Sequence, residues 1–108
     1  MKLTGKCKED FDKWFEIEYS SCAIYDYWIN EDLGISMQYG VYVDFFDSVG
    51  ISVNNKRVDF NNQTWFCSIV NNNYIEIKND LPINHFKTRT QARAAAIEKA
   101  NEIYNNED

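Results

Sequence analysis

The chain has 108 residues, a length that suits one hydrophobic core, so we predict a single domain over residues 1–108. Hydrophobic residues make up 44% and aromatic residues 16% of it, which excludes an intrinsically disordered protein, and no apolar run reaches the roughly 20 residues that cross a bilayer. The net charge of −6 is unevenly placed: residues 14–55 contain no Lys or Arg, and so negative a block disfavours nucleic acid, whose phosphates bind basic side chains.

The first predicted element is an amphipathic helix over about residues 6–19. Apolar side chains recur there at helical spacing, at Cys7, Phe11, Trp14 and Phe15. The next stretch, residues 20–35, shows no period, and Gly34 suits a turn. We predict a long irregular connection there.

Residues 36–49 fit two different elements. Alternating apolar residues favour a strand, whereas apolar residues at a spacing of about 3.6 favour a helix. Ser36 is a good N-cap and Gly50 is a good residue just beyond a last helical turn, while Asp44 and Asp47 are unfavourable near a helix C-terminus. We predict a helix.

After Gly50 the pattern changes to short β-type runs separated by asparagines. The runs cover residues 51–53, 57–60, 64–70 and 74–78, and the separators are residues 54–55, 61–63 and 71–73. Asparagine tolerates the left-handed conformation that tight hairpins need. We therefore predict an antiparallel meander of three or four strands.

The last predicted element is a long helix that starts near Thr88. Thr88 and Gln91 fit a capping box, and the alanines behind them are strong helix formers. One face carries small or apolar residues suited to packing on a sheet: Ala92, Ala96, Ala100, Ile103 and Tyr104. We expect fraying from Asn105 onward. The predicted fold class is thus α+β, with two N-terminal helices, the meander, and a C-terminal helix packed on the sheet.

Two stretches carry a resemblance to known proteins. The run SMQYGVYVDFFDSVGI covers residues 36–51, and KTRTQAR at residues 87–93 is followed by EKANEIY at residues 98–104. Together they cover about a third of the chain and resemble segments of small uncharacterised proteins of bacteriophages and prophages. The resemblance implies a viral or mobile-element origin and brings no activity with it. With no apolar N-terminal stretch of signal-peptide length, we expect the cytoplasm, that of the host cell for a phage protein.

One pattern is typical of metal-dependent nucleases. Glu76 and Lys78 alternate on a predicted strand, and Asp59 stands on a neighbouring strand, an arrangement in which carboxylates hold Mg²⁺ and the lysine positions water. The simpler interpretation is that Glu76 and Lys78 face solvent from an amphipathic strand. We keep the Mg²⁺-dependent nuclease as an alternative function.

The order helix, meander, helix also resembles the double-stranded-RNA-binding domain. Such domains hold phosphates with basic residues at the start of the last helix, where this chain has Lys87, Arg89 and Arg93. The lysine pair and glycine turn of that signature are missing. RNA binding is a second alternative, and solvated cap-flanking side chains are the simpler interpretation.

No catalytic or metal-binding cluster is predicted. His85 is the single histidine, and Cys7, Cys22 and Cys67 are widely spaced, so neither a zinc site nor a Cys–His pair is favoured. We expect reduced thiols, no catalytic residues, no metal and no cofactor.

An aromatic and acidic cluster in the aperiodic segment is the candidate binding site. Tyr and Trp surrounded by carboxylates have the composition of a hot spot for a basic protein surface. Its members are Tyr25, Asp26, Tyr27, Trp28, Glu31 and Asp32. The alternative is that these aromatic side chains belong to the core. We predict a small acidic accessory protein that is not an enzyme and that binds a protein with a basic surface.

Overall fold

The computed structural model describes residues 2–59, 64–70, 76–77 and 88–106. Within these residues, helices and strands follow one another in the order α1, α2, α3, β1, β2, β3, α4. Their bounds are α1 Gly5–Tyr19, α2 Ala23–Ile29, α3 Ile35–Ser48, β1 Ser52–Asp59, β2 Thr64–Val70, β3 Glu76–Ile77 and α4 Arg89–Asn106.

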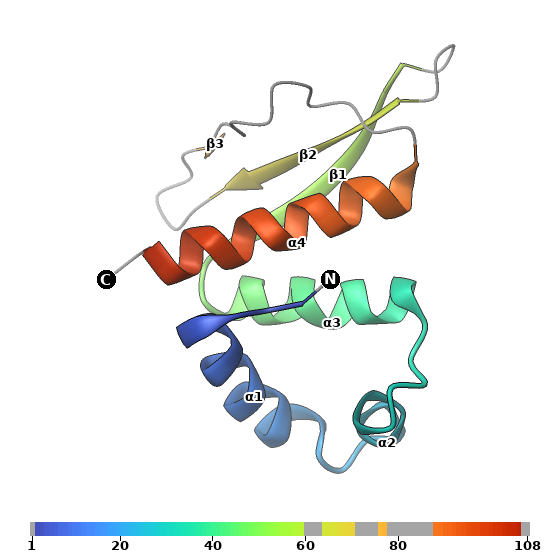
Figure 1. Ribbon diagram of the computed structural model, residues 1–108, viewed down its shortest axis with the longest axis vertical. Helices are drawn as coiled ribbons and strands as arrows, with labels where there is room; N and C mark the ends of the chain where they lie inside the picture. The colour runs from blue at the N-terminus through green and yellow to red at the C-terminus, as the bar shows by residue number, and fades with distance from the viewer. Residues whose placement is uncertain (1, 60–63, 71–75, 78–87, 107–108) are drawn as a thin grey trace.

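The last helix, α4, forms the middle layer of the fold. The strands β1 and β2 lie against one side of it, and α3 and α1 lie against the other (Figure 1). The short helix α2 packs beside α1, on the side of the molecule away from the strands. Helix α4 is therefore enclosed between the N-terminal helices and the hairpin.

An aromatic cluster fills the space between α1, α2 and α3. The ring of Phe11 has its centroid 5.1 Å from that of Tyr42, 5.3 Å from that of Trp28 and 5.4 Å from that of Phe45. Burying an aromatic side chain of this size contributes about 2–3 kcal/mol. The apolar stripes of α1 and α3 meet in this cluster, which explains why both segments are helical.

The helix predicted over residues 36–49 is confirmed. It starts one residue earlier than expected, because Gly34 is the N-cap and its carbonyl accepts the backbone N–H of Gln38 at 2.9 Å. At the other end Gly50 has φ of 85°, the left-handed conformation expected of the residue beyond a last turn.

The helix predicted to start near Thr88 is also confirmed. The Thr88 hydroxyl accepts a hydrogen bond from the backbone N–H of Gln91 at 3.1 Å, as a helix N-cap does. Ala92, Ala96 and Ala100 are fully buried, so small side chains bring α4 close to its neighbours. The predicted fraying from Asn105 is wrong, because the helix continues through Asn106.

The predicted fold class, α+β around a three- to four-stranded antiparallel meander, is wrong. It gives the strands too large a share of the fold and the helices too small a share. The described residues are mainly helical, with helices of 15, 7, 14 and 18 residues. Strand structure amounts to one antiparallel hairpin of 8 and 7 residues plus a third strand of 2 residues beside β2. The helices bury most of the core, because the aromatic residues are concentrated in the first half of the chain.

Three helices precede the hairpin instead of the predicted two. The stretch 20–35, expected to be irregular, contains α2. Its apolar residues point both ways: Ile24 and Trp28 pack against the core, while Tyr27 and Ile29 are exposed. Because apolar residues lie on both faces of α2, the sequence shows no helical spacing of apolar residues there. Tertiary packing, not a local sequence signal, stabilises this helix.

The asparagine pair at residues 54–55 is not a turn. Both residues belong to β1, where Asn54 pairs with Ser68 and Asn55 pairs with Cys67. Two predicted strands are therefore one continuous strand, because the antiparallel pairing with β2 outweighs the local turn preference of asparagine. The predicted turns at residues 61–63 and 71–73 lie outside the described residues.

Candidate functional site

The cation-free block, residues 14–55, folds into the end of α1, all of α2 and α3, and the start of β1. Its carboxylates are exposed, namely Glu16, Glu18, Asp26, Glu31, Asp32, Asp44 and Asp47. The block therefore presents its negative charge to solvent at the helical end of the molecule.

Large exposed hydrophobic side chains are found on the same block. In the described residues they are Ile17, Tyr27, Ile29, Ile35 and Met37, and each is more than half exposed. Four of these five were not among the predicted site residues. Ile17 could have been found, because it lies off the stripe formed by Phe11 and Phe15 on α1. We call the exposed carboxylates and these five hydrophobic residues together the acidic apolar surface.

The predicted aromatic cluster is divided between the surface and the core. Trp28 is half-buried, with its ring centroid 5.0 Å from that of Phe15. Tyr25 stacks on Phe15 at 5.6 Å, and its hydroxyl donates a hydrogen bond to Glu16 at 2.6 Å. That hydrogen bond, followed by burial, raises the pKa of Tyr25. Of the three predicted aromatic residues, only Tyr27 is exposed as an anchor would be.

The three predicted carboxylates stay on the surface. Asp26, Glu31 and Asp32 are all exposed. Glu31 has φ of 60°, and its backbone N–H donates to the carbonyl of Trp28 at 3.1 Å, so it closes the end of α2. The backbone N–H of Asp32 donates to the carbonyl of Tyr27 at 2.9 Å. These residues thus position the tip of α2 and add negative charge beside Tyr27.

A shallow groove of about 370 Å³ runs along α3 within this surface. Its lining is mostly apolar and comes from α1, α2 and α3: Tyr19, Ile24, Met37, Tyr39, Gly40, Val41, Val43 and Asp44. Asp44 is the single carboxylate in the lining, and it accepts a hydrogen bond from the Tyr19 hydroxyl at 3.3 Å. Burial, and then the neighbouring Asp44, raise the pKa of both Tyr19 and Asp47.

The strand register separates two members of the predicted nuclease site. Asp59 pairs with Thr64 at one end of β2, and Glu76 pairs with Val70 at the other end. Six residue steps along a strand amount to about 20 Å. Two carboxylates so far apart do not share one Mg²⁺ ion, because both would have to lie within bonding distance of it. Lys78 lies outside the described residues.

Of the three basic residues predicted to bind RNA, Arg93 makes contacts within the protein instead. Arg93 donates a hydrogen bond to the Ser36 hydroxyl at 3.1 Å, and its guanidinium lies 4.9 Å from the centroid of the Tyr39 ring. Both contacts hold Arg93 against α3. Arg89 is exposed in the first turn of α4, and Lys87 lies outside the described residues.

No cluster of metal-ligating side chains occurs in the part of the chain that the structure describes. Burial, with a smaller effect of Asp10, raises the pKa of Cys7 to about 12, so this thiol stays protonated. Cys22 is free and exposed. His85 lies outside the described residues.

None of the described helices is both long enough and apolar enough to cross a membrane. Compared with known proteins, the chain matches no protein-family model, no curated protein and no solved structure.

Proposed function

We propose that this protein acts by binding another protein, and that the groove along α3 receives a segment carrying both apolar and basic side chains. One observation carries the proposal. Among the residues whose side-chain exposure is described, 2–54, 69 and 88–106, the large exposed hydrophobic side chains all fall within the cation-free block, where seven exposed carboxylates accompany them. Scattered exposed hydrophobic residues are ordinary, but their confinement to one charged region is typical of an interaction surface.

The two components of this surface have different tasks in binding. Met37, Tyr27 and the groove lining offer apolar area, which supplies affinity when a partner covers it. The carboxylates attract a basic partner over a distance and disfavour acidic ones. A segment with apolar residues on one side and Lys or Arg on the other satisfies both, so it is the occupant to which we commit.

Gly40 leaves open space in the lining of the groove. Apart from its two chain neighbours and the nearby backbone of α3 itself, no atom lies within 4 Å of the position that a side-chain Cβ at Gly40 would take. A side chain from a partner can therefore approach the backbone of α3 there. The same opening makes Gly40 the best position at which to block the groove without disturbing the protein itself.

The alternatives receive less support from the geometry. A nuclease needs Asp59 and Glu76 at one metal ion, and the register places them at opposite ends of β2. Duplex RNA needs free basic side chains at the start of α4, and Arg93 is bound to α3. The resemblance to phage proteins supports an accessory role in a host cell, and we retain that origin and the cytoplasm as part of the proposal.

A pair of designed peptides tests the proposed function. The first forms a helix with leucines on one face and lysines on the other, and the second has glutamates in place of the lysines. We expect the lysine peptide to bind with an affinity that falls as salt is added, measured by fluorescence anisotropy, and the glutamate peptide not to bind. Equal binding of the two peptides would contradict the proposal.

Variants of Gly40 serve as a matched pair in the same assay. Gly40→Arg places a long cationic side chain in the groove and should weaken binding of the lysine peptide by about tenfold or more. Gly40→Ala adds one methyl group, leaves the groove open and should bind like the unchanged protein. Undiminished binding in Gly40→Arg would assign the peptide to another surface.

A further inference from the structure

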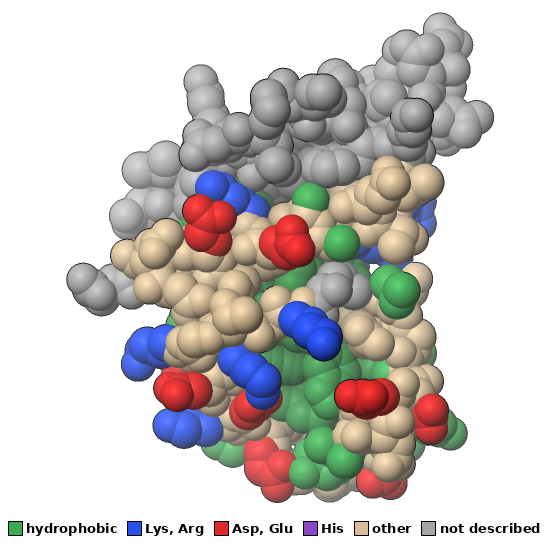
Figure 2. Space-filling view, viewed as in Figure 1, with side chains coloured by type: hydrophobic (Ala, Val, Ile, Leu, Met, Phe, Trp, Pro, Cys, Tyr) green, Lys and Arg blue, Asp and Glu red, His purple; other side chains and the backbone are tan. Residues whose placement is uncertain are grey.

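A second hollow lies on another face of the three N-terminal helices and is distinct from the groove along α3. Two adjoining cavities of about 270 Å³ and 360 Å³ share Lys2, Trp28 and Tyr42 in their walls, so they form one cleft. The first is completed by Leu3, Lys8, Phe11 and Asp12, and the second by Glu31, Leu33 and Gln38. We call it the Trp28–Tyr42 cleft. On this face hydrophobic side chains are gathered below α4, with charged side chains around them (Figure 2).

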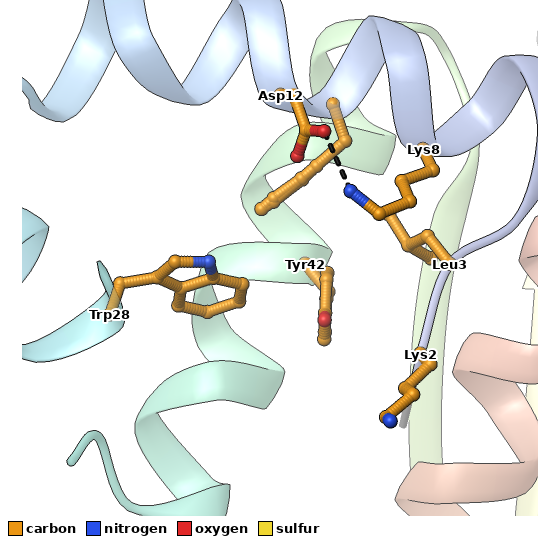
Figure 3. A pocket seen from close by; sticks show the side chains of 7 residues that line it. Lys2, Leu3, Lys8, Asp12, Trp28 and Tyr42 are labelled. Carbon is orange, nitrogen blue, oxygen red and sulfur yellow. Dashed lines mark hydrogen bonds and ion pairs between the residues drawn. The ribbon is translucent and has the colours of Figure 1, made fainter. Parts of the chain in front are cut away.

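Aromatic rings form the floor of the cleft. The indole of Trp28 meets the ring of Tyr42 edge to face at 5.2 Å, and Phe11 packs against both. Trp28 lies on one side of Tyr42 in Figure 3, and Lys2 and Lys8 lie on the other. Rigid rings held by their neighbours offer a preformed apolar platform, which suits a flat apolar group.

Tyr42 has a polar atom in this cleft that the fold does not use. The residue is only 7% exposed, it lines both cavities, and no hydrogen bond to its hydroxyl occurs within the described residues. Burial, followed by the nearby Asp12, raises its pKa to about 12, so the hydroxyl carries its proton at neutral pH. A hydroxyl that lines a cleft and has no protein partner is available to a ligand or to water.

The charged side chains at the rim of the cleft differ in whether they already form an ion pair. Lys8 and Asp12 form an ion pair at 2.7 Å, which appears as the dashed line in Figure 3. Lys2 has no ion pair within the described part of the chain, and it borders both cavities. Asp12 and Glu31 stand on the same rim, so a doubly charged anion such as a phosphate monoester would be repelled there.

We propose that the Trp28–Tyr42 cleft binds a small aromatic carboxylate. The ring of the ligand lies over Phe11 and Trp28, its carboxylate pairs with the ammonium of Lys2, and the Tyr42 hydroxyl donates a hydrogen bond to it. A single negative charge matches the one available lysine and tolerates the two carboxylates of the rim. The site is independent of protein binding at α3, because the two hollows have no lining residue in common.

Titration of the full chain with 2-naphthoate tests this site. The signal of the Trp28 indole N–H in a nitrogen–proton correlation spectrum, assigned by its loss in Trp28→Phe, should shift and saturate. 2-Naphthylmethylammonium and 2-naphthyl phosphate serve as probes of opposite and of doubled charge, and both should bind about tenfold or more weakly. Equal binding of the cation would overturn the role of Lys2, and tighter binding of the phosphate would overturn the choice of a carboxylate.

Three variants complete the test. Lys2→Glu should weaken 2-naphthoate about tenfold, while Lys13→Glu, the same charge change at an exposed position outside the cleft, should leave the affinity unchanged. Tyr42→Phe keeps the ring and removes the hydroxyl, so it should weaken binding about fivefold and leave the chain folded. An absence of saturable shifts at millimolar 2-naphthoate, or equal losses in Lys2→Glu and Lys13→Glu, would overturn the proposal.

Discussion

Asn105 near the end of α4 holds the backbone of Cys7 in the first turn of α1. Its side-chain oxygen accepts the Cys7 backbone N–H at 2.8 Å, and its side-chain nitrogen donates to the Thr4 carbonyl at 2.9 Å. One turn earlier, Asn101 accepts the backbone N–H of Thr4 at 2.9 Å. The N-cap Thr4 makes no capping hydrogen bond of its own. The start of α1 is therefore capped by side chains from the far end of the chain.

Replacing Asn105 with alanine should lower the free energy of unfolding by about 2 kcal/mol. The change leaves the amide of Cys7 without its partner and removes one of the two donors to the carbonyl of Thr4, which costs as much as a lost helix cap. Urea denaturation followed by circular dichroism measures the difference. Asn106→Ala, at the exposed next position, is the control and should change stability by less than about 0.5 kcal/mol.

Two glycine-to-alanine changes should have opposite effects on stability. Gly5 has φ of 60°, and a Cβ there would meet Asn105 Oδ1 at 3.2 Å, so Gly5→Ala should destabilise the fold by about 1–2 kcal/mol. Gly40 lies in α3, and an added Cβ would meet no atom within 4 Å beyond its chain neighbours and the nearby backbone of α3, so Gly40→Ala should stabilise the fold by about 0.5–1 kcal/mol. Thermal unfolding of both variants would contradict this account if the shifts had the same sign.

Replacing Glu31 with glycine should stabilise the protein. Glu31 has φ of 60°, a left-handed conformation that glycine adopts without the strain of a side chain. We expect a gain of about 0.5–1 kcal/mol in denaturant titrations. Glu9→Gly, at an exposed position in the interior of α1, is the matched control and should cost about 1 kcal/mol, because a helix interior disfavours glycine. A loss of stability in Glu31→Gly would show that the contacts of the Glu31 side chain stabilise the fold by more than the backbone strain costs.

The adjacent residues Tyr27 and Trp28 should respond very differently to alanine. Trp28 packs on Phe11, Phe15 and Tyr42, so Trp28→Ala should cost about 3 kcal/mol or more of stability. Tyr27 is exposed, so Tyr27→Ala should cost less than about 0.5 kcal/mol and should weaken only partner binding. Equal stability losses would place both residues in the core.

Stability should decline as the pH is raised through the alkaline range. Burial raises the pKa of Cys7 from 9.0 to about 12 and that of Tyr42 from 10.0 to about 12. The hydrogen bond to Asp10, followed by burial, raises the pKa of Tyr104 from 10.0 to about 12. The unfolded chain therefore loses these protons first, and the stabilisation that is complete below about pH 9 is lost as the pH approaches 12.

Urea midpoints measured at successive pH values check the alkaline decline. The series starts about one unit below the ordinary cysteine pKa of 9.0 and extends upward from there. Tyr42→Phe and Tyr104→Phe should each make the decline less steep, because each removes one of the groups responsible. A midpoint that is constant or rises over this range would contradict the assigned direction of the shifts.

The helices α1, α3 and α4 were predictable because each carries its own local signals. The apolar stripe of α1, the Gly50 terminus of α3 and the Thr88 cap of α4 all depend on residues within one or two turns. Local interactions of this kind favour the same conformation before and after the chain folds. The excess of carboxylates over residues 14–55 could likewise be read directly, and all of them are exposed.

The candidate site depended on contacts that the sequence does not reveal. Whether Tyr27 or Trp28 faces solvent was decided when α2 packed against Phe11 and Phe15, since both residues have the same local context. The separation of Asp59 from Glu76 was decided by the strand register, and the continuity of β1 through Asn54 by its partner strand.

By itself, the sequence determined the first and last long helices, the single-domain length and the negative charge of residues 14–55, because these follow from composition and from neighbours along the chain, whereas residues 36–49 fitted a strand as well as a helix. Only the tertiary structure decided that α2 is a helix, that exposed hydrophobic residues join the acidic block, and that Asn105 caps α1. Each of these depends on a free energy shared between segments distant in the sequence, and such a term becomes available only when the segments meet.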